Sequence, residues 1–258
     1  MFFDPSGRSD ALGSRAKIGV MVPTTNTIVQ PEFDDLRPPG VTNHVARIEP
    51  SSAGIAPGDV ETYAKRLERG NATILKGIGD LVPCAPDMIV LAHSINSFRG
   101  GFVGARKMKA ELETHAGGTP VILPSLAFLA ALDVLGVGQR VSVLTPFWAP
   151  GDAQVRTFLE SAGHSVCRIK GLECPGPLSI ASVRADDITR LLDELAADKP
   201  DVILQPGTNM ASARVAAVAW ERHGIPVLSC NTTTYWHALR SLSINDRRTG
   251  FGALMAEH

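Results

Sequence analysis

The sequence of 258 residues lacks most features that would assign a protein to a specialised class. Positive and negative side chains nearly cancel, with a formal net charge of −1, so nothing predicts a nucleic-acid or membrane-surface partner. Aliphatic runs such as 121–123 are strand-length and far shorter than the roughly 20 apolar residues that a membrane span needs. The segment 1–15 has an early acidic residue and no apolar core, unlike a secretory signal. We expect a soluble protein with an N-terminal tail or oligomer arm.

Cysteine and histidine are too sparse to predict a metal site. Four cysteines, Cys84, Cys167, Cys174 and Cys230, show no metal-type spacing, so we expect the reduced thiols of a cytoplasmic protein. None of the seven histidines forms an H-x-x-x-H pair. The hydrophobic fraction of 44% and charged fraction of 20% are those of an ordinary globular protein.

The chain does contain alternating strand and helix patterns. Aliphatic runs predict strands at 17–22, 43–48, 88–92, 120–123, 141–144, 165–169, 202–204 and 226–229. Apolar spacing predicts helices at 59–81 (with a break near Gly70), 102–115, 124–135, 152–163, 182–197, 211–223 and 232–242. We interpret 249–258 as a tail. The alternation predicts an α/β protein with parallel sheets.

The order of motifs repeats in the second half. The strand 17–23 resembles 140–146, Pro86-Asp87 resembles Pro200-Asp201, and 119–122 resembles 225–228, at offsets of about 123, 114 and 106 residues. We infer two similar lobes related by a pseudo-twofold axis, with a cleft between them. The expected division is a tail at 1–16, lobe 1 at 17–123 and 230–258, and lobe 2 at 124–229.

Polar loops follow the predicted strands. Open α/β sheets bind ligands at the carboxyl ends of their strands, and helix N-termini attract anions. The ligand expected is therefore a small carboxylic or dicarboxylic acid. Asn, Ser and Thr also serve as ordinary helix caps, so the interpretation rests on Asn26, Thr208, Asn209 and Asn231 as a set. The loops are Pro23–Thr27, His93–Ser97, Pro124-Ser125, Gly207–Asn209 and Cys230–Thr234.

Seven short segments together resemble the aspartate/glutamate racemase superfamily, in its maleate cis-trans isomerase and arylmalonate decarboxylase branch. They are Val22–Thr27 (VPTTNT), Ser94–Phe98 (SINSF), Thr145–Phe147 (TPF), Gly207–Asn209 (GTN), Ser229–Asn231 (SCN), Tyr235–Arg240 (YWHALR) and Gly250–Gly252 (GFG). The resemblance implies two flavodoxin-like lobes, an interlobe active site, a small carboxylate substrate and chemistry without a cofactor. We also expect a homo-oligomer.

The sequence departs from this branch at its cysteine positions. The first holds His93, or Ala92 if the register slips by one residue, and the second holds Gly207. Phe147 stands in place of the usual tyrosine. The thiol mechanism of the branch therefore does not transfer to this chain.

His93 is the predicted catalytic acid or base, because imidazole titrates near neutral pH. A neutral histidine hydrogen-bonded to a loop is the alternative. Phe147 and Cys230 are further candidates, although strand alternation would turn Cys230 away if Asn231 faces the cleft. We discount the other three cysteines and interpret His237 as structural. The predicted substrate-binding residues are Thr25, Asn26, Ser94, Gly207, Thr208, Asn209 and Asn231.

Three functions remain open at this point. The first is maleate isomerase-like cis-trans isomerisation or related proton transfer. The second is a decarboxylase, lyase or hydratase with His93 as its single acid/base. The third is a sensor that binds a carboxylate without turnover. Gly207 further suggests room for a substrate bulkier than maleate.

Overall fold

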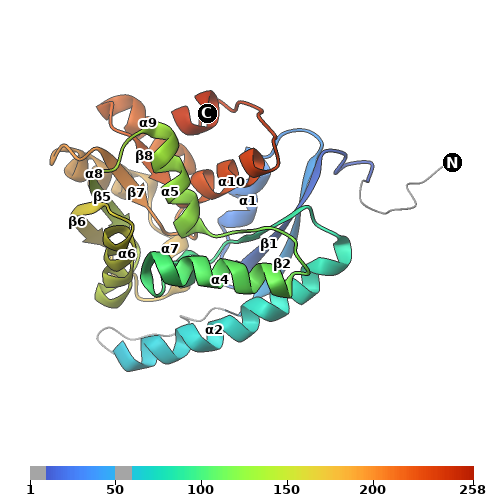
Figure 1. Ribbon diagram of the computed structural model, residues 1–258. Helices are drawn as coiled ribbons and strands as arrows, with labels where there is room; N and C mark the ends of the chain where they lie inside the picture. The colour runs from blue at the N-terminus through green and yellow to red at the C-terminus, as the bar shows by residue number, and fades with distance from the viewer. Residues whose placement is uncertain (1–9, 50–59) are drawn as a thin grey trace.

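Two parallel sheets lie side by side in the computed structural model, which describes residues 10–49 and 60–258 (Figure 1). The strand orders are β2-β1-β3-β4 and β6-β5-β7-β8. The predicted two-lobe α/β fold is confirmed. The first sheet comprises β1 (Ala16–Pro23), β2 (Val41–Ile48), β3 (Met88–Leu91) and β4 (Val121–Ile122). The second comprises β5 (Arg140–Thr145), β6 (Ser165–Gly171), β7 (Val202–Gln205) and β8 (Val227–Ser229).

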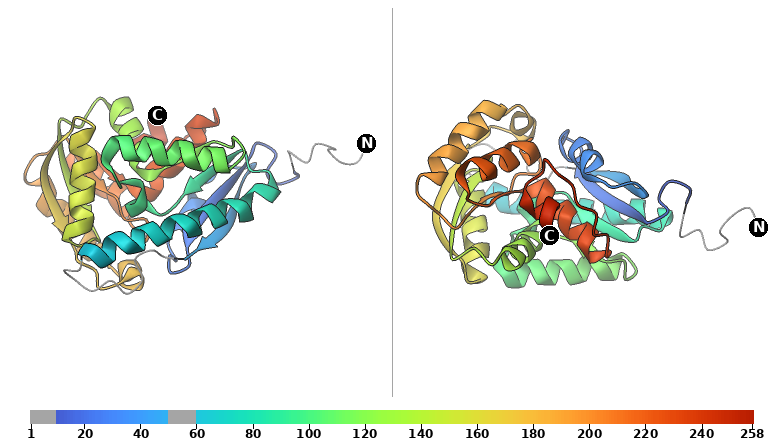
Figure 2. Two further views of the ribbon diagram at one scale, coloured as in Figure 1. Left: turned by 60° about the horizontal axis from the view of Figure 1, so that its bottom comes forward. Right: turned by 90° about the horizontal axis from the view of Figure 1, so that it is seen from above.

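Helices cover the two sheets and fill the space between them (Figure 2). The helices of the first half are α1 (Val29–Leu36), α2 (Val60–Leu81), the 3-10 turn η1 (Val82–Cys84), α3 (Ser94–Ser97), α4 (Gly101–His115) and α5 (Pro124–Leu135). Those of the second half are α6 (Ala149–Ser161), α7 (Pro177–Ala181), α8 (Ala185–Ala196), α9 (Ala213–His223), α10 (Cys230–Ser241) and α11 (Ala253–Glu257).

The sequence repeat corresponds to a structural repeat, in which the two Pro-Asp segments make the same pair of hydrogen bonds to a neighbouring strand. In the first sheet the Asp87 carboxylate accepts a hydrogen bond from the Lys17 N–H at 2.8 Å, and the Asp87 N–H donates to the Lys17 carbonyl at 2.8 Å. Asp201 and Arg140 repeat this pair in the second sheet, at 2.8 and 2.9 Å. Each Pro-Asp segment thus fixes the start of a central strand against its neighbour.

Several details differ from the sequence-based expectations. Helix α2 continues through Gly70 without the predicted break, and Asp59 lies outside the described residues. Helix α1 has no counterpart among the predicted helices. The expected C-terminal tail contains α11, and the expected N-terminal tail ends in β1, because Ala16 is already paired with Val41. Residues 1–9 of that tail lie outside the described part of the chain.

Helix α10 joins the lobes at the centre of the molecule, next to α5 (Figure 1). It follows β8 of the second sheet, yet its Tyr235 ring packs on Phe33 of α1, with ring centroids 4.7 Å apart. The Tyr235 hydroxyl donates to Asn43 Oδ1 of β2 at 3.0 Å. Because these buried contacts span both sheets, one hydrophobic core runs through the junction. The exact lobe boundaries stay a prediction.

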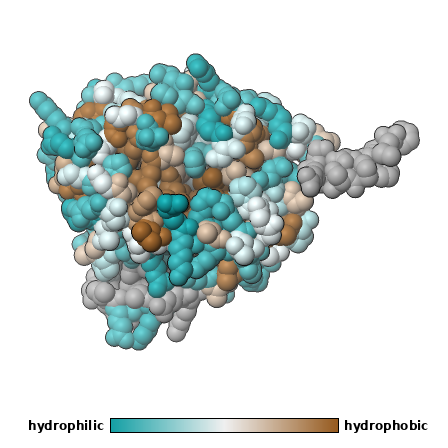
Figure 3. All heavy atoms as spheres, viewed as in Figure 1, coloured by the Kyte–Doolittle hydropathy of each residue, from teal (hydrophilic) through white to brown (hydrophobic). Residues whose placement is uncertain are grey.

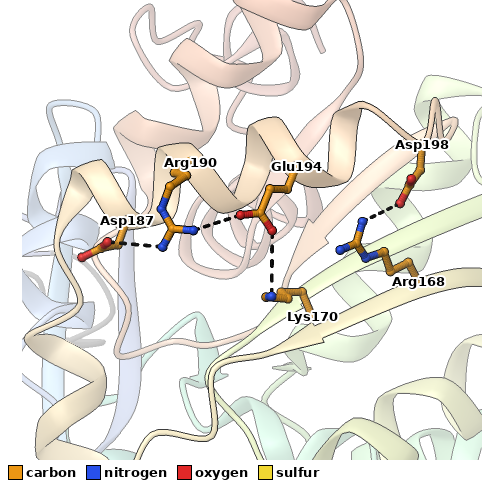
Figure 4. Close-up of polar contacts among 6 residues, drawn as sticks. All are labelled: Arg168, Lys170, Asp187, Arg190, Glu194 and Asp198. Carbon is orange, nitrogen blue, oxygen red and sulfur yellow. Dashed lines mark hydrogen bonds and ion pairs between the residues drawn. The ribbon is translucent and has the colours of Figure 1, made fainter.

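Charged side chains cover the edge strand β6 and the outer face of α8 (Figure 4). Arg168 pairs with Asp198 at 3.0 Å, and Glu194 pairs with Arg190 at 2.9 Å and Lys170 at 3.8 Å. Such exposed pairs are each worth about 0–1 kcal/mol, but charges on an edge strand discourage pairing with another chain.

In the view of Figure 1, hydrophobic residues gather on the surface over α5 and along its border with α4 (Figure 3). No helix in the described residues has the length and apolarity to cross a membrane.

Candidate active site

A pocket of about 800 Å³, counted with its open mouth, lies where loops from both lobes meet. These loops follow β1, β3, β5, β6 and β7, so the carboxyl ends of five strands converge there. Of the five loops expected at the site, Pro124-Ser125 and Cys230–Thr234 do not line this pocket, whereas the loops after β5 and β6 do. Among the described residues, no Asp, Glu, Lys or Arg lines it. The lining residues are Pro23, Thr25, Asn26, His93, Ser94, Ile95, Pro146, Phe147, Trp148, Cys174, Pro175, Gly176, Pro177, Ile180, Gly207, Thr208 and Asn209.

Asn26 serves both as a helix cap and as a wall of this pocket. Its side-chain oxygen accepts hydrogen bonds from the N–H groups of Ile28 and Val29, both at 3.0 Å, and so begins α1. Its amide nitrogen donates to the Thr208 hydroxyl of the other lobe at 3.3 Å. The capping function and the pocket position therefore coexist in one side chain.

Asn209 ties three loops together. Its side-chain oxygen accepts from the Thr27 N–H at 3.0 Å. Its amide nitrogen donates to the Pro177 carbonyl at 2.7 Å and to the Thr25 carbonyl at 3.4 Å. This network crosses from the second lobe to the first, so Asn209 holds the pocket closed on one side.

His93 lies two residues after the end of β3 and directly precedes the short helix α3. Its side chain lines the pocket although it is only 7% exposed. Ala92 is buried and does not line the pocket, whereas His93 does. Burial lowers the pKa of His93 to about 4, because the charged imidazolium loses water. At neutral pH the unliganded site thus presents a neutral imidazole, which is the form that accepts a proton.

Gly207 faces protein rather than empty space. A Cβ atom there would lie 2.6 Å from Pro146 Cγ, 2.7 Å from its Cδ and 2.8 Å from Gln205 Nε2. The hypothesis that Gly207 makes room for a bulkier substrate is wrong, because Pro146 and Gln205 fill that room. Gln205 is itself fixed, since it donates to the Gly207 carbonyl at 3.1 Å and accepts from the Ser212 hydroxyl at 2.6 Å.

Asn231 and Cys230 lie beneath the pocket and do not line it. The expected direct contact of Asn231 with a carboxylate does not match this placement. Its amide nitrogen donates to Glu32 Oε2 at 2.6 Å and to the Thr208 carbonyl at 2.9 Å. Cys230 is fully buried beside the Ser94 hydroxyl, and burial raises the pKa of its thiol. Both residues belong to the first turn of α10, so the alternation of a strand does not apply to them.

Two loops of the second lobe build an apolar wall. The Cys174 N–H donates to the Pro146 carbonyl at 3.1 Å, and Trp148 Nε1 donates to the Cys174 carbonyl at 3.0 Å. Phe147 lies on this wall, where it was predicted. Cys174 was expected to lie far from the site, but it lines the pocket, whereas Cys84, Cys167 and His237 do not.

The chain matches the family model described as arylmalonate decarboxylase over residues 18–255. The chain belongs to the arylmalonate decarboxylase family. The maleate isomerase of Nocardia farcinica is 24% identical over 253 residues, which cover 93% of this chain and 96% of that protein. The maleate isomerase of Geobacillus stearothermophilus is 23% identical and is covered to 97%. These matches confirm the branch that the sequence motifs indicated.

Solved structures of this family share the fold. Maleate cis-trans isomerase of Nocardia farcinica bound to TRIS superimposes with a TM-score of 0.84 at 23% identity, covering 94% of this chain and 98% of the other. A variant of that enzyme with a covalently bound succinylcysteine intermediate gives 0.83. A liganded double mutant of arylmalonate decarboxylase gives 0.81 at 19% identity. In the described part of this chain, no three His, Cys, Asp or Glu side chains are grouped to hold a metal ion.

Proposed function

We propose that this protein is an enzyme that moves a proton on a small mono- or dicarboxylic acid without a cofactor, as an isomerase or decarboxylase. The observation that carries the proposal is a buried imidazole in a pocket whose other polar groups are uncharged hydroxyls and amides. Hydroxyl and N–H groups stabilise a carboxylate by hydrogen bonding, and a low-dielectric site strengthens them.

The proposed roles follow from the placement of the side chains. Ser94 and Thr208 supply hydroxyls from opposite lobes, and Asn26 and Asn209 hold the loops that present them. His93 carries the proton. An anionic substrate beside the imidazole raises its pKa from the value of about 4 in the empty pocket, because opposite charge favours the imidazolium. Substrate binding therefore loads the proton that the reaction delivers.

The reaction type is suggested by the apolar wall. Maleate has two carboxylates and no apolar substituent, whereas Phe147, Trp148 and Ile180 offer a surface for one. This favours decarboxylation of a substituted malonate over isomerisation of maleate. In that reaction the bond to one carboxylate breaks, CO₂ leaves, and the electron pair forms an enediolate on the other. The His93 imidazolium then protonates the carbon and is reprotonated from solvent.

Isomerisation is the second candidate, because the curated relatives are maleate isomerases. The relative with a succinylcysteine intermediate uses a cysteine for a covalent bond to its substrate. In this chain the motif comparison assigns His93 and Gly207 to the cysteine positions. An isomerase of this kind would add the neutral His93 imidazole to the double bond instead of a thiolate, and release it after rotation.

The test is an NMR assay in D₂O with phenylmalonate, methyl(phenyl)malonate and maleate. We expect loss of CO₂ with deuterium at the α-carbon from the malonates. His93→Ala should abolish turnover, and His115→Ala, which removes an exposed histidine at the end of α4, should leave it intact. Turnover that survives in His93→Ala would exclude the proposed role. Conversion of maleate alone would favour the isomerase, and thermal stabilisation by these acids without turnover would favour a sensor.

We also propose that the protein acts in the cytoplasm, as its scattered cysteines suggest, and that it is a homo-oligomer. Light scattering coupled to size-exclusion chromatography tests the second point directly. A mass of one 27.4 kDa chain at micromolar concentration would refute it.

A further inference from the structure

We infer that Glu32 is a positioning residue for the pocket, acting on Thr208 through the side chain of Asn231. Glu32 lies on α1 of the first lobe and does not line the pocket. Its Oε2 accepts from Asn231 Nδ2 at 2.6 Å, and the same amide nitrogen donates to the Thr208 carbonyl at 2.9 Å. The inference rests on the proposed function only in taking Thr208 as a substrate-binding residue.

The contacts form a closed ring across the junction of the lobes. Asn26 begins α1 through its side-chain oxygen and contacts the Thr208 hydroxyl through its nitrogen. Glu32, one turn further along α1, returns to Thr208 by way of Asn231. Thr208 is therefore held at its hydroxyl by Asn26, just before α1, and at its carbonyl by Asn231, which Glu32 of α1 contacts. Its position in the pocket depends on both connections.

Glu32 is anchored on the second lobe by a helix N-terminus. Its Oε1 accepts from the Ala213 N–H at 3.0 Å, at the first residue of α9, and the backbone of Ser212 adds another hydrogen bond. These N–H groups stabilise a carboxylate, so Oε1 is fixed and Oε2 is aimed at Asn231. A carboxylate is required here because both of its oxygens accept hydrogen bonds.

Replacing the carboxylate by an isosteric amide breaks the connection. In Glu32→Gln one carboxylate oxygen is replaced by an NH₂ group, which is a donor. This group faces another donor, either the Ala213 N–H or the Asn231 amide nitrogen, so one hydrogen bond is lost. If Asn231 turns over to accept this donor, its oxygen faces the Thr208 carbonyl and the hydrogen bond to Thr208 is lost. The size of the side chain is unchanged, so the effect is one of hydrogen bonding.

Asp35 provides the matched control. It lies on the same helix and also crosses to α9, where its carboxylate pairs with Arg214 at 2.6 Å. This pair is largely exposed, and no hydrogen bond within the described part of the chain connects it to Thr208 or Asn231. If Glu32 only holds the lobes together, Glu32→Gln and Asp35→Asn should have similar consequences. If Glu32 positions Thr208, only Glu32→Gln should alter the pocket.

The experiment measures malonate binding by calorimetry and amide hydrogen exchange of the segment 205–211. For Glu32→Gln we expect about tenfold weaker malonate binding, since a lost hydrogen bond weakens binding by roughly that factor, and faster exchange in this segment. Asp35→Asn should stay within about twofold of the wild type. Glu32→Gln/Asn231→Ala should bind no more weakly than Asn231→Ala, because both changes break one pathway.

Three results would overturn the inference. They are wild-type binding and exchange in Glu32→Gln, equal losses in Glu32→Gln and Asp35→Asn, and multiplicative losses in the double variant. If the wild type binds no malonate, that result counts against the proposed function. Exchange in the segment 205–211 then decides the role of Glu32 without a ligand.

Discussion

Substitution of Gly207 tests how the second lobe shapes the pocket. Gly207→Ala places a Cβ within 2.6–2.8 Å of three atoms of Pro146 and Gln205. Neither neighbour yields easily, because Pro146 is a ring whose carbonyl is bonded to the Cys174 N–H, and Gln205 is fully buried. Overpacking of this kind costs about 1–3 kcal/mol. We expect a loss of about 2 kcal/mol in the free energy of unfolding.

For a protein of this size, 1 kcal/mol corresponds to a shift of about 2–4 °C, so the melting temperature should fall by about 4–8 °C. Urea unfolding gives the free energy, and a thermal melt gives the shift. Gly79→Ala is the control, because no atom lies within 4 Å of its Cβ position and it is exposed on α2. It should be neutral or stabilising by up to about 1 kcal/mol.

A Gly207→Ala protein that melts within about 1 °C of the wild type would refute this account of the site. The same reasoning applies to Gly207→Cys, whose Cβ meets the same atoms. Restoring a thiol at this position is therefore expected to destabilise the pocket rather than to recreate the chemistry of the relatives.

Three further predictions concern other parts of the molecule. Between pH 6.5 and about 4 the unfolded state binds the His93 proton and the folded state does not, so the contribution of His93 to stability should fall by about 3 kcal/mol as pH drops through this window. Burial raises the pKa of Asp152 to about 6, which changes stability in the opposite direction, so the loss should be measured as the difference between urea titrations of the wild type and His93→Gln. Iodoacetamide at pH 7.5 should label the exposed Cys167 first and Cys174 slowly, because burial raises the pKa of the Cys174 thiol. Phenylmalonate should protect only Cys174 from this labelling, as measured by peptide mapping. Asp87→Ala and Asp201→Ala should each lower the free energy of unfolding by about 1 kcal/mol, because each aspartate side chain accepts a hydrogen bond from one strand N–H, and the two losses should add in the double variant. Unequal or non-additive losses in urea unfolding would contradict the equivalence of the two sites.

The fold was predictable because the same order of strand and helix patterns occurs in both halves of the sequence. Strand-length aliphatic runs recur with the same Pro-Asp start, and each Asp makes the same two bonds to the neighbouring strand. Helix α1 escaped prediction because it has only eight residues and Pro31 lies in its first turn. Its apolar spacing at Val29, Phe33 and Leu36 was an available signal. Missing α1 also concealed Glu32.

The site was predictable where residues lie within three positions after the end of a strand. His93, Thr208 and Asn26 line the pocket for that reason. Cys174 follows the carboxyl end of β6 at the same spacing as Thr208 from β7, with two residues between it and the strand. Its loop returns to the pocket through bonds to the 145–147 segment, which the sequence does not indicate. Asn231 resembled a ligand-binding residue because amides serve ligands and scaffolds alike. Its hydrogen bonds to Glu32 and to the Thr208 carbonyl show that Asn231 contacts the protein framework.

The symmetric framework carries an asymmetric site, and this predicts the stereochemistry of the product. Leu91 and Gln205 end equivalent strands, but the first exit leads to a titratable imidazole and the second to Gly207, which is fixed by the Gln205 amide. Within the described residues, His93 and Cys174 are the only titratable groups that line the pocket.

If His93 alone delivers the proton, it reaches one face of the enediolate, and methyl(phenyl)malonate should give a single enantiomer of the product, measured by chiral chromatography. A racemic product that becomes enantiopure in Cys174→Ala would show that the thiol of the second lobe protonates the opposite face. A racemic product in both proteins would mean that the enediolate is protonated by solvent, and His93 would then not be the proton donor.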